Sequence, residues 1–125
     1  MAKVLVADDD APIANVVAHK LRNAGLDVVV AMDGQEAYER ALIERPDLIV
    51  TDLQMPGLSG LEVCARLAAE LGRPGIPTIL LTAKGFEVGP EAVRDLPVRR
   101  VMTKPFSPRE LMGYVREALG MPAGV

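Results

Sequence analysis

Polar residues that could bind a cation or take part in group transfer stand at the ends of apolar runs in this sequence. The run "VLVA" leads directly into three consecutive aspartates, and single polar residues stand near the ends of three later runs: Asp8, Asp9, Asp10, Asp52, Thr82 and Lys104. Carboxylates are among the oxygen ligands that Mg²⁺ takes in proteins. These residue types indicate a divalent cation site for Mg²⁺ or Mn²⁺, provided that the fold brings the runs together.

Short apolar runs alternate with amphipathic stretches along the chain. The runs "VLVA", "LDVVVA", "DLIVT", "TILLT" and "VRRVM" predict five strands. Helices are predicted over 12–24, 34–44, 60–71 and 108–119, with a poorer helix before the fifth strand. Nearly uniform hydrophobicity within strands is typical of a parallel sheet with helices on both faces. The sequence therefore predicts a doubly wound (βα)5 domain of the α/β class.

Three of the predicted helices begin with a capping-box pattern. In this pattern a side-chain oxygen accepts a free backbone N–H of the first turn, and a carboxylate three residues later accepts the N–H of the capping residue. The pairs are Asp33 with Glu36, Ser59 with Glu62, and Ser107 with Glu110.

The C-terminal ends of the strands in such a sheet lie along one edge, where ligands bind. We therefore expect Asp8, Asp9 and Asp52 to meet Thr82 and Lys104 there. Three carboxylates against one ammonium leave an excess of negative charge, and like charges a few ångströms apart repel by several kcal/mol at an effective dielectric constant of about 20. A bound Mg²⁺ would neutralise this excess.

Asp10 has a simpler interpretation than its two neighbours. It stands just before the helix that begins near Pro12, so we expect its side chain to cap that helix. A nucleotide site would need glycines and backbone N–H groups at this turn, whereas the chain offers carboxylates that repel phosphate. Nucleotide or flavin binding without a metal is not expected.

Length and charge limit the remaining function classes. The 125 residues suit one domain, with its core over 3–119 and a short tail over 120–125. The net charge is −3, with 14 basic residues scattered among 17 acidic ones, so direct nucleic-acid binding is not expected. The apolar runs are too short to cross a bilayer, and the first residues do not fit a signal peptide. We expect a cytoplasmic protein that does not bind membranes.

Four motifs occur in order along the chain, each at a predicted strand end. They are the pair Asp8 and Asp9, "PDLIVTDLQMPGLSG" around Asp52, "LLTAK" with Thr82, and "TKPF" with Lys104. With these motifs the sequence resembles the receiver domain of two-component response regulators over residues 3–119. The resemblance implies a flavodoxin-like sheet of strand order 2-1-3-4-5.

The resemblance also implies a phosphoacceptor and a metal site. Asp52 would take a phosphoryl group from a sensor histidine kinase or a histidine phosphotransfer protein, or from a small acyl phosphate. Asp9, Asp52 and the backbone carbonyl of Gln54 would bind Mg²⁺ directly, with Asp8 acting through a metal-bound water. Lys104 would pair with a phosphoryl oxygen.

Further positions near the site follow from the same resemblance. The Thr82 hydroxyl would donate to the phosphoryl group, and the small Ala83 would leave access open. Pro105 after Lys104 invites a cis peptide bond, because only an X–Pro bond makes the cis form cheap. Gln54 and Lys84 could guard the phosphoryl group from water.

Two features depart from the receiver pattern. Val101 stands where receivers usually carry a switch aromatic, and valine has no ring to swing inward. The segment "AKGFEVGPEAVRDLPVRR" contains Gly85, Gly89, Pro90 and Pro97, which predicts a short or mobile helix between the fourth and fifth strands.

A downstream protein is expected to bind a face formed by that segment, the fifth strand and the last helix. This face carries charged residues: Arg94, Arg99, Arg100, Arg109, Glu110 and Arg116. We expect a monomer or a weak dimer.

Two other functions stay open. One is a haloacid-dehalogenase-like phosphohydrolase, with Asp8 as nucleophile and Asp10 as general acid. The other is a degenerate receiver that acts as a scaffold without phosphorylation.

Overall fold

The computed structural model describes residues 1–72, 74–83 and 88–122. Its sheet consists of β1 (Lys3–Ala7), β2 (Asp27–Ala31), β3 (Leu48–Asp52), β4 (Thr78–Thr82) and β5 (Val98–Thr103). All neighbouring strands are parallel, and their order is β2-β1-β3-β4-β5. The predicted class and strand order are confirmed.

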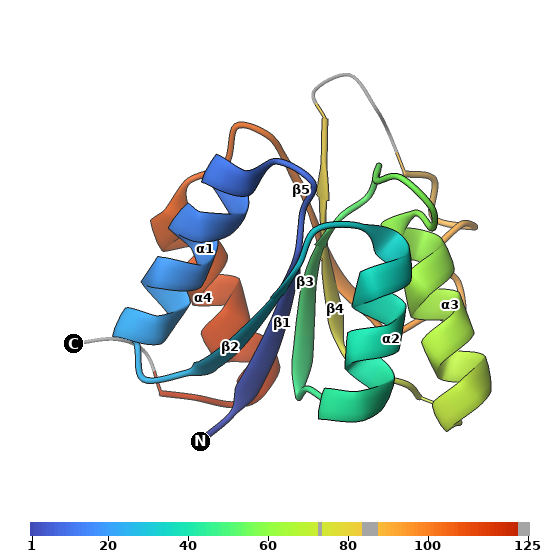
Figure 1. Ribbon diagram of the computed structural model, residues 1–125, viewed down its shortest axis with the longest axis horizontal. Coiled ribbons are helices and arrows are strands. Elements are labelled where there is room, and N and C mark those ends of the chain that lie inside the picture. The colour runs from blue at the N-terminus through green and yellow to red at the C-terminus, as the bar shows by residue number, and fades with distance from the viewer. Residues whose placement is uncertain (73, 84–87, 123–125) are drawn as a thin grey trace.

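Four helices cover the two faces of this sheet among the described residues: α1 (Ala11–Asn23), α2 (Gly34–Glu44), α3 (Gly60–Leu71) and α4 (Pro108–Leu119). In Figure 1, α1 and α4 lie on one face, and α2 and α3 lie on the other. Side chains of β1 point alternately to the two faces of the sheet. Val4 and Val6 belong to the core under α1 and α4. Leu5 and Ala7 belong to the core under α2 and α3. None of these helices has the length and apolar content needed to span a membrane.

The connection between β4 and β5 differs from the expected βα unit. In its described part, residues 90–95 form consecutive turns, with i to i−3 hydrogen bonds such as Ala92 N to Gly89 O (3.1 Å) and Leu96 N to Val93 O (3.1 Å). Pro90 is the first residue of these turns and Pro97 follows them, so only a short segment lies between the two prolines. The predicted short helix is therefore replaced by turns over 90–95. Residues 84–87, which include Gly85 and Lys84, lie outside the described residues.

The predicted capping box is complete at α3 and altered at α2. Ser59 Oγ accepts from Glu62 N, and the Glu62 carboxylate accepts from Ser59 N. At α2, Asp33 accepts from Glu36 N (2.7 Å), but the Glu36 carboxylate accepts from Met32 N (2.6 Å). The return bond therefore reaches one residue further back than the pattern predicts.

The other two helix starts rely on one side-chain cap each. Asp10 Oδ1 accepts from Ile13 N (3.3 Å), which agrees with the capping role expected for this aspartate. At α4, Ser107 Oγ accepts from Glu110 N (3.3 Å), whereas the Glu110 carboxylate accepts from the Tyr114 hydroxyl (3.4 Å). The exposed Glu110 side chain thus points along its own helix.

Candidate functional site

Four strand ends place the polar residues of the site next to one another. Asp8 directly follows β1, Asp52 ends β3, Thr82 ends β4, and Lys104 directly follows β5. The strand register aligns these ends, since Asp52 pairs with Leu81, and Thr82 with Thr103. Lys104 N also donates to Thr82 O (2.7 Å), which holds the chain beyond β5 against the end of β4.

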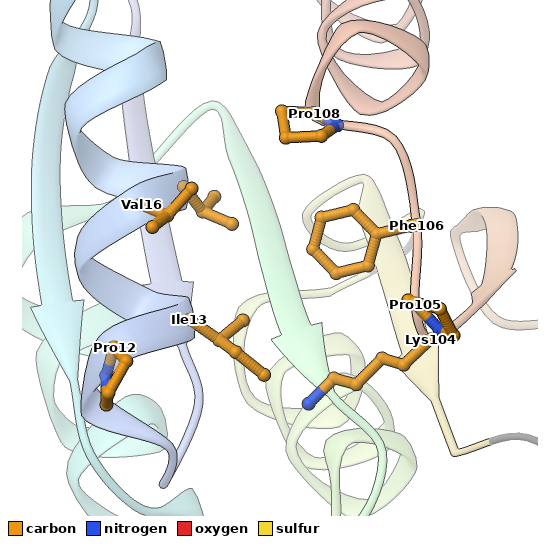
Figure 2. A pocket seen from close by; sticks show the side chains of 8 residues that line it. Pro12, Ile13, Val16, Lys104, Pro105, Phe106 and Pro108 are labelled. Carbon is orange, nitrogen blue, oxygen red and sulfur yellow. The ribbon is translucent and has the colours of Figure 1, made fainter.

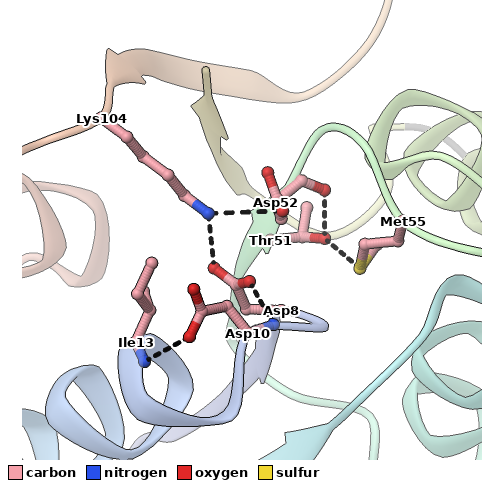
Figure 3. Close-up of polar contacts among 7 residues, drawn as sticks. All are labelled: Asp8, Asp10, Ile13, Thr51, Asp52, Met55 and Lys104. Atoms are coloured by element: carbon pink, nitrogen blue, oxygen red, sulfur yellow. Dashed lines mark hydrogen bonds and ion pairs between the residues drawn. The ribbon is translucent and has the colours of Figure 1, made fainter. Parts of the chain in front are cut away.

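The Asp8 carboxylate is buried and has a donor on each oxygen. Its side chain is 1% exposed. Oδ1 accepts from Asp10 N (2.9 Å), and Oδ2 accepts from Lys104 Nζ (2.9 Å). Figure 3 shows the Lys104 ammonium between Asp8 and Asp52. The distance from Lys104 Nζ to Asp52 Oδ2 is 3.3 Å. One ammonium therefore joins the ends of β1, β3 and β5.

A third carboxylate completes an acidic cluster. Asp8, Asp9 and Asp52 each offer an oxygen within 4.8 Å of the other two, and Asp9 is exposed. Burial raises the pKa of Asp52, and the charges of Asp8 and Asp9 raise it further, while Lys104 opposes both effects only in part. The ionised form of Asp52 is thus less favourable here than it is in water.

The electrostatics of Lys104 complement those of the cluster. Burial acts to lower its pKa, but the hydrogen bond to Asp8 and the charges of Asp52 and Asp8 outweigh that effect, so the pKa is raised. Lys104 therefore keeps its charge at neutral pH, and the cluster still carries a negative excess.

This donor set fits a small divalent cation. All three side chains offer carboxylate oxygens, which Mg²⁺ and Mn²⁺ take together with water molecules. Two of the three are buried, so the positive charge of an ion would act in a medium with weak solvent screening. An ion there would offset the repulsion that raises the pKa of Asp52.

The remaining predicted residues surround the cluster. Thr82 is buried at the end of β4, and both Ala83 and Gln54 are exposed. The Lys104–Pro105 peptide bond is cis.

The stem of Lys104 runs along an apolar groove between α1 and the loop that precedes α4. Figure 2 shows Ile13 and Val16 of α1 on one side of this groove and Phe106 on the other. The groove has a volume of about 270 Å³. These apolar walls cover the methylene groups of Lys104 while its ammonium reaches the acidic cluster.

The connection from β3 to α3 is held close to the phosphoacceptor candidate. Gly60 N donates to Leu53 O (2.8 Å), and a Cβ atom on Gly60 would lie 2.5 Å from Asp52 O. Only glycine allows the first turn of α3 to approach this carbonyl so closely. The hydroxyl of Thr51, the residue before Asp52, donates a hydrogen bond to the Asp52 carbonyl (3.0 Å). This contact was not predicted from the sequence.

Val101, which stands where receivers usually carry an aromatic residue, is 42% exposed on β5. The aromatic ring beside this strand comes from α4, where Tyr114 lies under the guanidinium of Arg100 at 4.5 Å. Arg100 also lies 3.8 Å from Glu117. These contacts join β5 to α4, and the sequence pattern had not singled out Tyr114.

Comparison with protein families gives one match over most of the chain. A family model described as "Response regulator receiver domain" matches residues 4–116. The alkaline phosphatase synthesis transcriptional regulatory protein PhoP of Bacillus subtilis (strain 168) is 41% identical over 117 residues, which are 94% of this chain and 48% of PhoP. The chain thus spans about half the length of this curated relative.

Solved structures show the same fold. A Francisella response regulator receiver domain superposes with a TM-score of 0.85 at 35% identity, covering 96% of this chain and 98% of that one. The chemotaxis protein CheY4 of Vibrio cholerae gives a TM-score of 0.82 at 31% identity, covering 94% of this chain and 98% of that one.

Proposed function

This chain belongs to the response regulator receiver domain family, and from that membership we propose that Asp52 accepts a phosphoryl group and that phosphorylation changes the affinity of the domain for a partner protein. The observation that carries the proposal is the placement of Asp52. Asp52 is the last residue of β3, and the residue is 8% exposed. A carboxylate oxygen of Asp52 lies within 4.8 Å of oxygens of Asp8 and Asp9, and Oδ2 lies 3.3 Å from Lys104 Nζ.

In the proposed step, a carboxylate oxygen of Asp52 forms a bond to phosphorus. The bond from phosphorus to a histidine nitrogen of the donor, or to the acyl oxygen of a small donor, breaks, and its electron pair leaves with the donor. Phosphoryl transfer depends mainly on positioning and on charge neutralisation. Lys104 pairs with a phosphoryl oxygen, and the Thr82 hydroxyl donates to another.

Asp9, Asp52 and the backbone carbonyl of Gln54 are the proposed direct ligands of Mg²⁺ or Mn²⁺, and Asp8 would act through a metal-bound water. When bound, the ion supplies positive charge that offsets the carboxylates and the incoming phosphoryl oxygens. The cluster of three carboxylate oxygens within 4.8 Å of one another supports this assignment, and burial together with the charge of Asp8 raises the pKa of Asp52.

The proposed partners are a sensor histidine kinase or a histidine phosphotransfer protein, and a downstream protein. The downstream protein would bind the face of residues 88–97, β5 and α4. On this face Arg94, Arg99, Arg109 and Glu110 are exposed, and Arg100 contacts Tyr114. Receiver domains act as signalling domains and are not generally classed as enzymes. The proposed chemistry of this domain is limited to transfer of the phosphoryl group to its own Asp52 and the slow loss of that group to water.

Mapping the modified residue tests this proposal. The protein is incubated with acetyl phosphate and Mg²⁺, digested, and analysed by mass spectrometry. We expect the phosphoryl group on Asp52. A label on Asp8 would support the phosphohydrolase instead, although the capping bond of Asp10 to Ile13 N already gives Asp10 a structural role. Absence of any label would support the unphosphorylated scaffold.

A further inference from the structure

The Thr51 side chain is buried directly behind the phosphoacceptor candidate. The residue is 1% exposed, and its hydroxyl lies 3.0 Å from the Asp52 carbonyl oxygen and 3.8 Å from Met55 Sδ. A hydroxyl has a single proton to donate, and 3.0 Å is within the range of an O–H···O bond. The proton is therefore donated to the Asp52 carbonyl, and the Met55 sulfur packs against the same hydroxyl. Figure 3 shows this arrangement next to the acidic cluster.

The Asp52 carbonyl lies past the end of the ladder between β1 and β3, although Asp52 still pairs with Leu81 of β4. The ladder between β1 and β3 ends at the pair Ala7 and Thr51, one residue before Asp52. On another side the first turn of α3 approaches this carbonyl, since a Cβ on Gly60 would lie 2.5 Å from it and 3.1 Å from Thr51 Cγ2. A buried carbonyl at such a place needs a donor, and Thr51 supplies one.

The same peptide group sets the direction of the chain that leads to a proposed ligand, the Gln54 carbonyl. Rotation of the peptide that contains the Asp52 carbonyl would leave the Asp52 side chain in place, but it would change the direction of the chain that leads from Leu53 to Gln54. Leu53 N donates to Leu81 O (2.7 Å), so one side of this connection is held by β4. The Thr51 hydroxyl holds the other side.

We propose that Thr51 is a positioning residue for the cation site, whose hydroxyl fixes the peptide after Asp52 and thereby aims the Gln54 carbonyl. This inference rests on the proposed function, because it concerns the same site. Groups that orient metal ligands without touching the ion commonly change metal affinity by about 10- to 100-fold when they are removed.

The test measures Mg²⁺ affinity by isothermal titration calorimetry in the full chain. Thr51→Val removes the hydroxyl and keeps the branched shape, and we expect it to raise the Mg²⁺ dissociation constant by about 10-fold or more. Thr51→Ser keeps the hydroxyl and should bind Mg²⁺ like the wild type. Thr51→Val with wild-type affinity for Mg²⁺ would overturn the inference.

A matched control separates positioning from stability. The buried Thr78 hydroxyl also donates to a backbone carbonyl, that of Ile76 (2.9 Å), but at the opposite end of the sheet. Thr78→Val should lower the unfolding temperature without changing Mg²⁺ affinity. Equal losses of affinity in the two valine variants would show a merely structural role.

Two further comparisons keep the result unambiguous. If Thr51→Val does not fold, Thr51→Ser is compared with Thr51→Ala, because both lack the methyl group and differ only in the hydroxyl. The wild type is also titrated with Mg²⁺ and treated with acetyl phosphate. If the wild type neither binds Mg²⁺ nor becomes phosphorylated, the proposed function fails together with the inference. If the wild type binds Mg²⁺ and becomes phosphorylated, and the Thr51 variants bind Mg²⁺ with the same affinity, only the inference fails.

Discussion

Lys104 Nζ lies 2.9 Å from Asp8 Oδ2, although 96 positions of sequence separate the two residues. This contact joins the first and the last strand ends of the fold. The ammonium offsets one of three neighbouring carboxylates, so the site is stable enough to fold and still carries the negative charge that a divalent cation would neutralise.

Removal of the Lys104 charge should destabilise the fold. Lys104→Met keeps an unbranched side chain but leaves Asp8 buried without its counter-charge. We expect the free energy of unfolding at neutral pH to fall by roughly 2–4 kcal/mol, since breaking a buried ion pair leaves an uncompensated charge. The loss should shrink on acidification, because a protonated Asp52 carboxyl, whose pKa is raised by burial and by Asp8, no longer needs the ammonium. Urea denaturation at neutral and acidic pH measures both quantities.

The control for this variant is Lys20→Met, which removes an exposed charge from α1. Its effect should stay within about 0.5 kcal/mol, as for most surface substitutions. If Lys104→Met proves as stable as Lys20→Met at neutral pH, the ion pair with Asp8 does not hold the site together.

Neutralisation of Asp52 should stabilise the metal-free protein. The pKa of Asp52 is raised by burial and by Asp8, so over the interval between its ordinary value and this raised value the folded state holds more protons than the unfolded state. Wild-type stability must then decrease as pH rises through this interval. Asp52→Asn lacks this decrease, so at neutral pH the variant should be more stable than the wild type and unfold at a higher Tm.

Thermal unfolding across the pH range, in EDTA, measures this difference. The gain of Asp52→Asn should vanish below the ordinary pKa of an aspartate. Adding Mg²⁺ should stabilise the wild type more than the variant, because a ligand stabilises the state that binds it. A variant that is less stable than the wild type at neutral pH would show that the Lys104 contact outweighs burial and repulsion.

The close approach at Gly60 provides a third prediction. Gly60→Ala would place a methyl group against the Asp52 carbonyl, and we expect a loss of about 1–3 kcal/mol from overpacking. Gly113→Ala on α4 is the control, because its new Cβ meets no atom within 4 Å. An exposed glycine in a helix interior costs about 1 kcal/mol relative to alanine, so this control should gain stability. Chemical denaturation of both variants decides the matter, and similar effects at the two sites would contradict the packing described here.

The exposed Gln54 side chain provides a fourth prediction. If it guards the phosphoryl group from attacking water, Gln54→Ala should shorten the lifetime of the phosphorylated protein. The lifetime is measured from the loss of the phosphoryl mass after the donor is removed. An unchanged lifetime would leave Gln54 with its backbone carbonyl as its proposed contribution.

The architecture was predictable because the strands are short, apolar and separated by amphipathic stretches. A run such as "TILL" fits a strand that is buried on both faces, and β4 is buried throughout. The connection before β5 was harder to predict, since prolines and glycines show where a helix is disfavoured but not which turns replace it. Capping was predictable only in part, because the rotamer of Glu36 depends on neighbours that the sequence does not reveal.

The site was predictable to the extent that it depends on strand ends. In a parallel sheet these ends meet at one edge, which is why Asp8, Asp52 and Lys104 could be grouped from the sequence. The individual role of each residue within the site was not predictable. Thr51 lies within a predicted apolar strand, and the signal for its role is a hydroxyl in an otherwise apolar run directly before Asp52.

The most direct test of the central claim is the intact mass of the protein after incubation with acetyl phosphate, with Mg²⁺ in one sample and EDTA in the other. The account predicts one added phosphoryl group per wild-type chain in Mg²⁺, and none in EDTA or in the Asp52→Asn variant. Equal labelling in Mg²⁺ and EDTA, or labelling of Asp52→Asn at the wild-type rate, would contradict it.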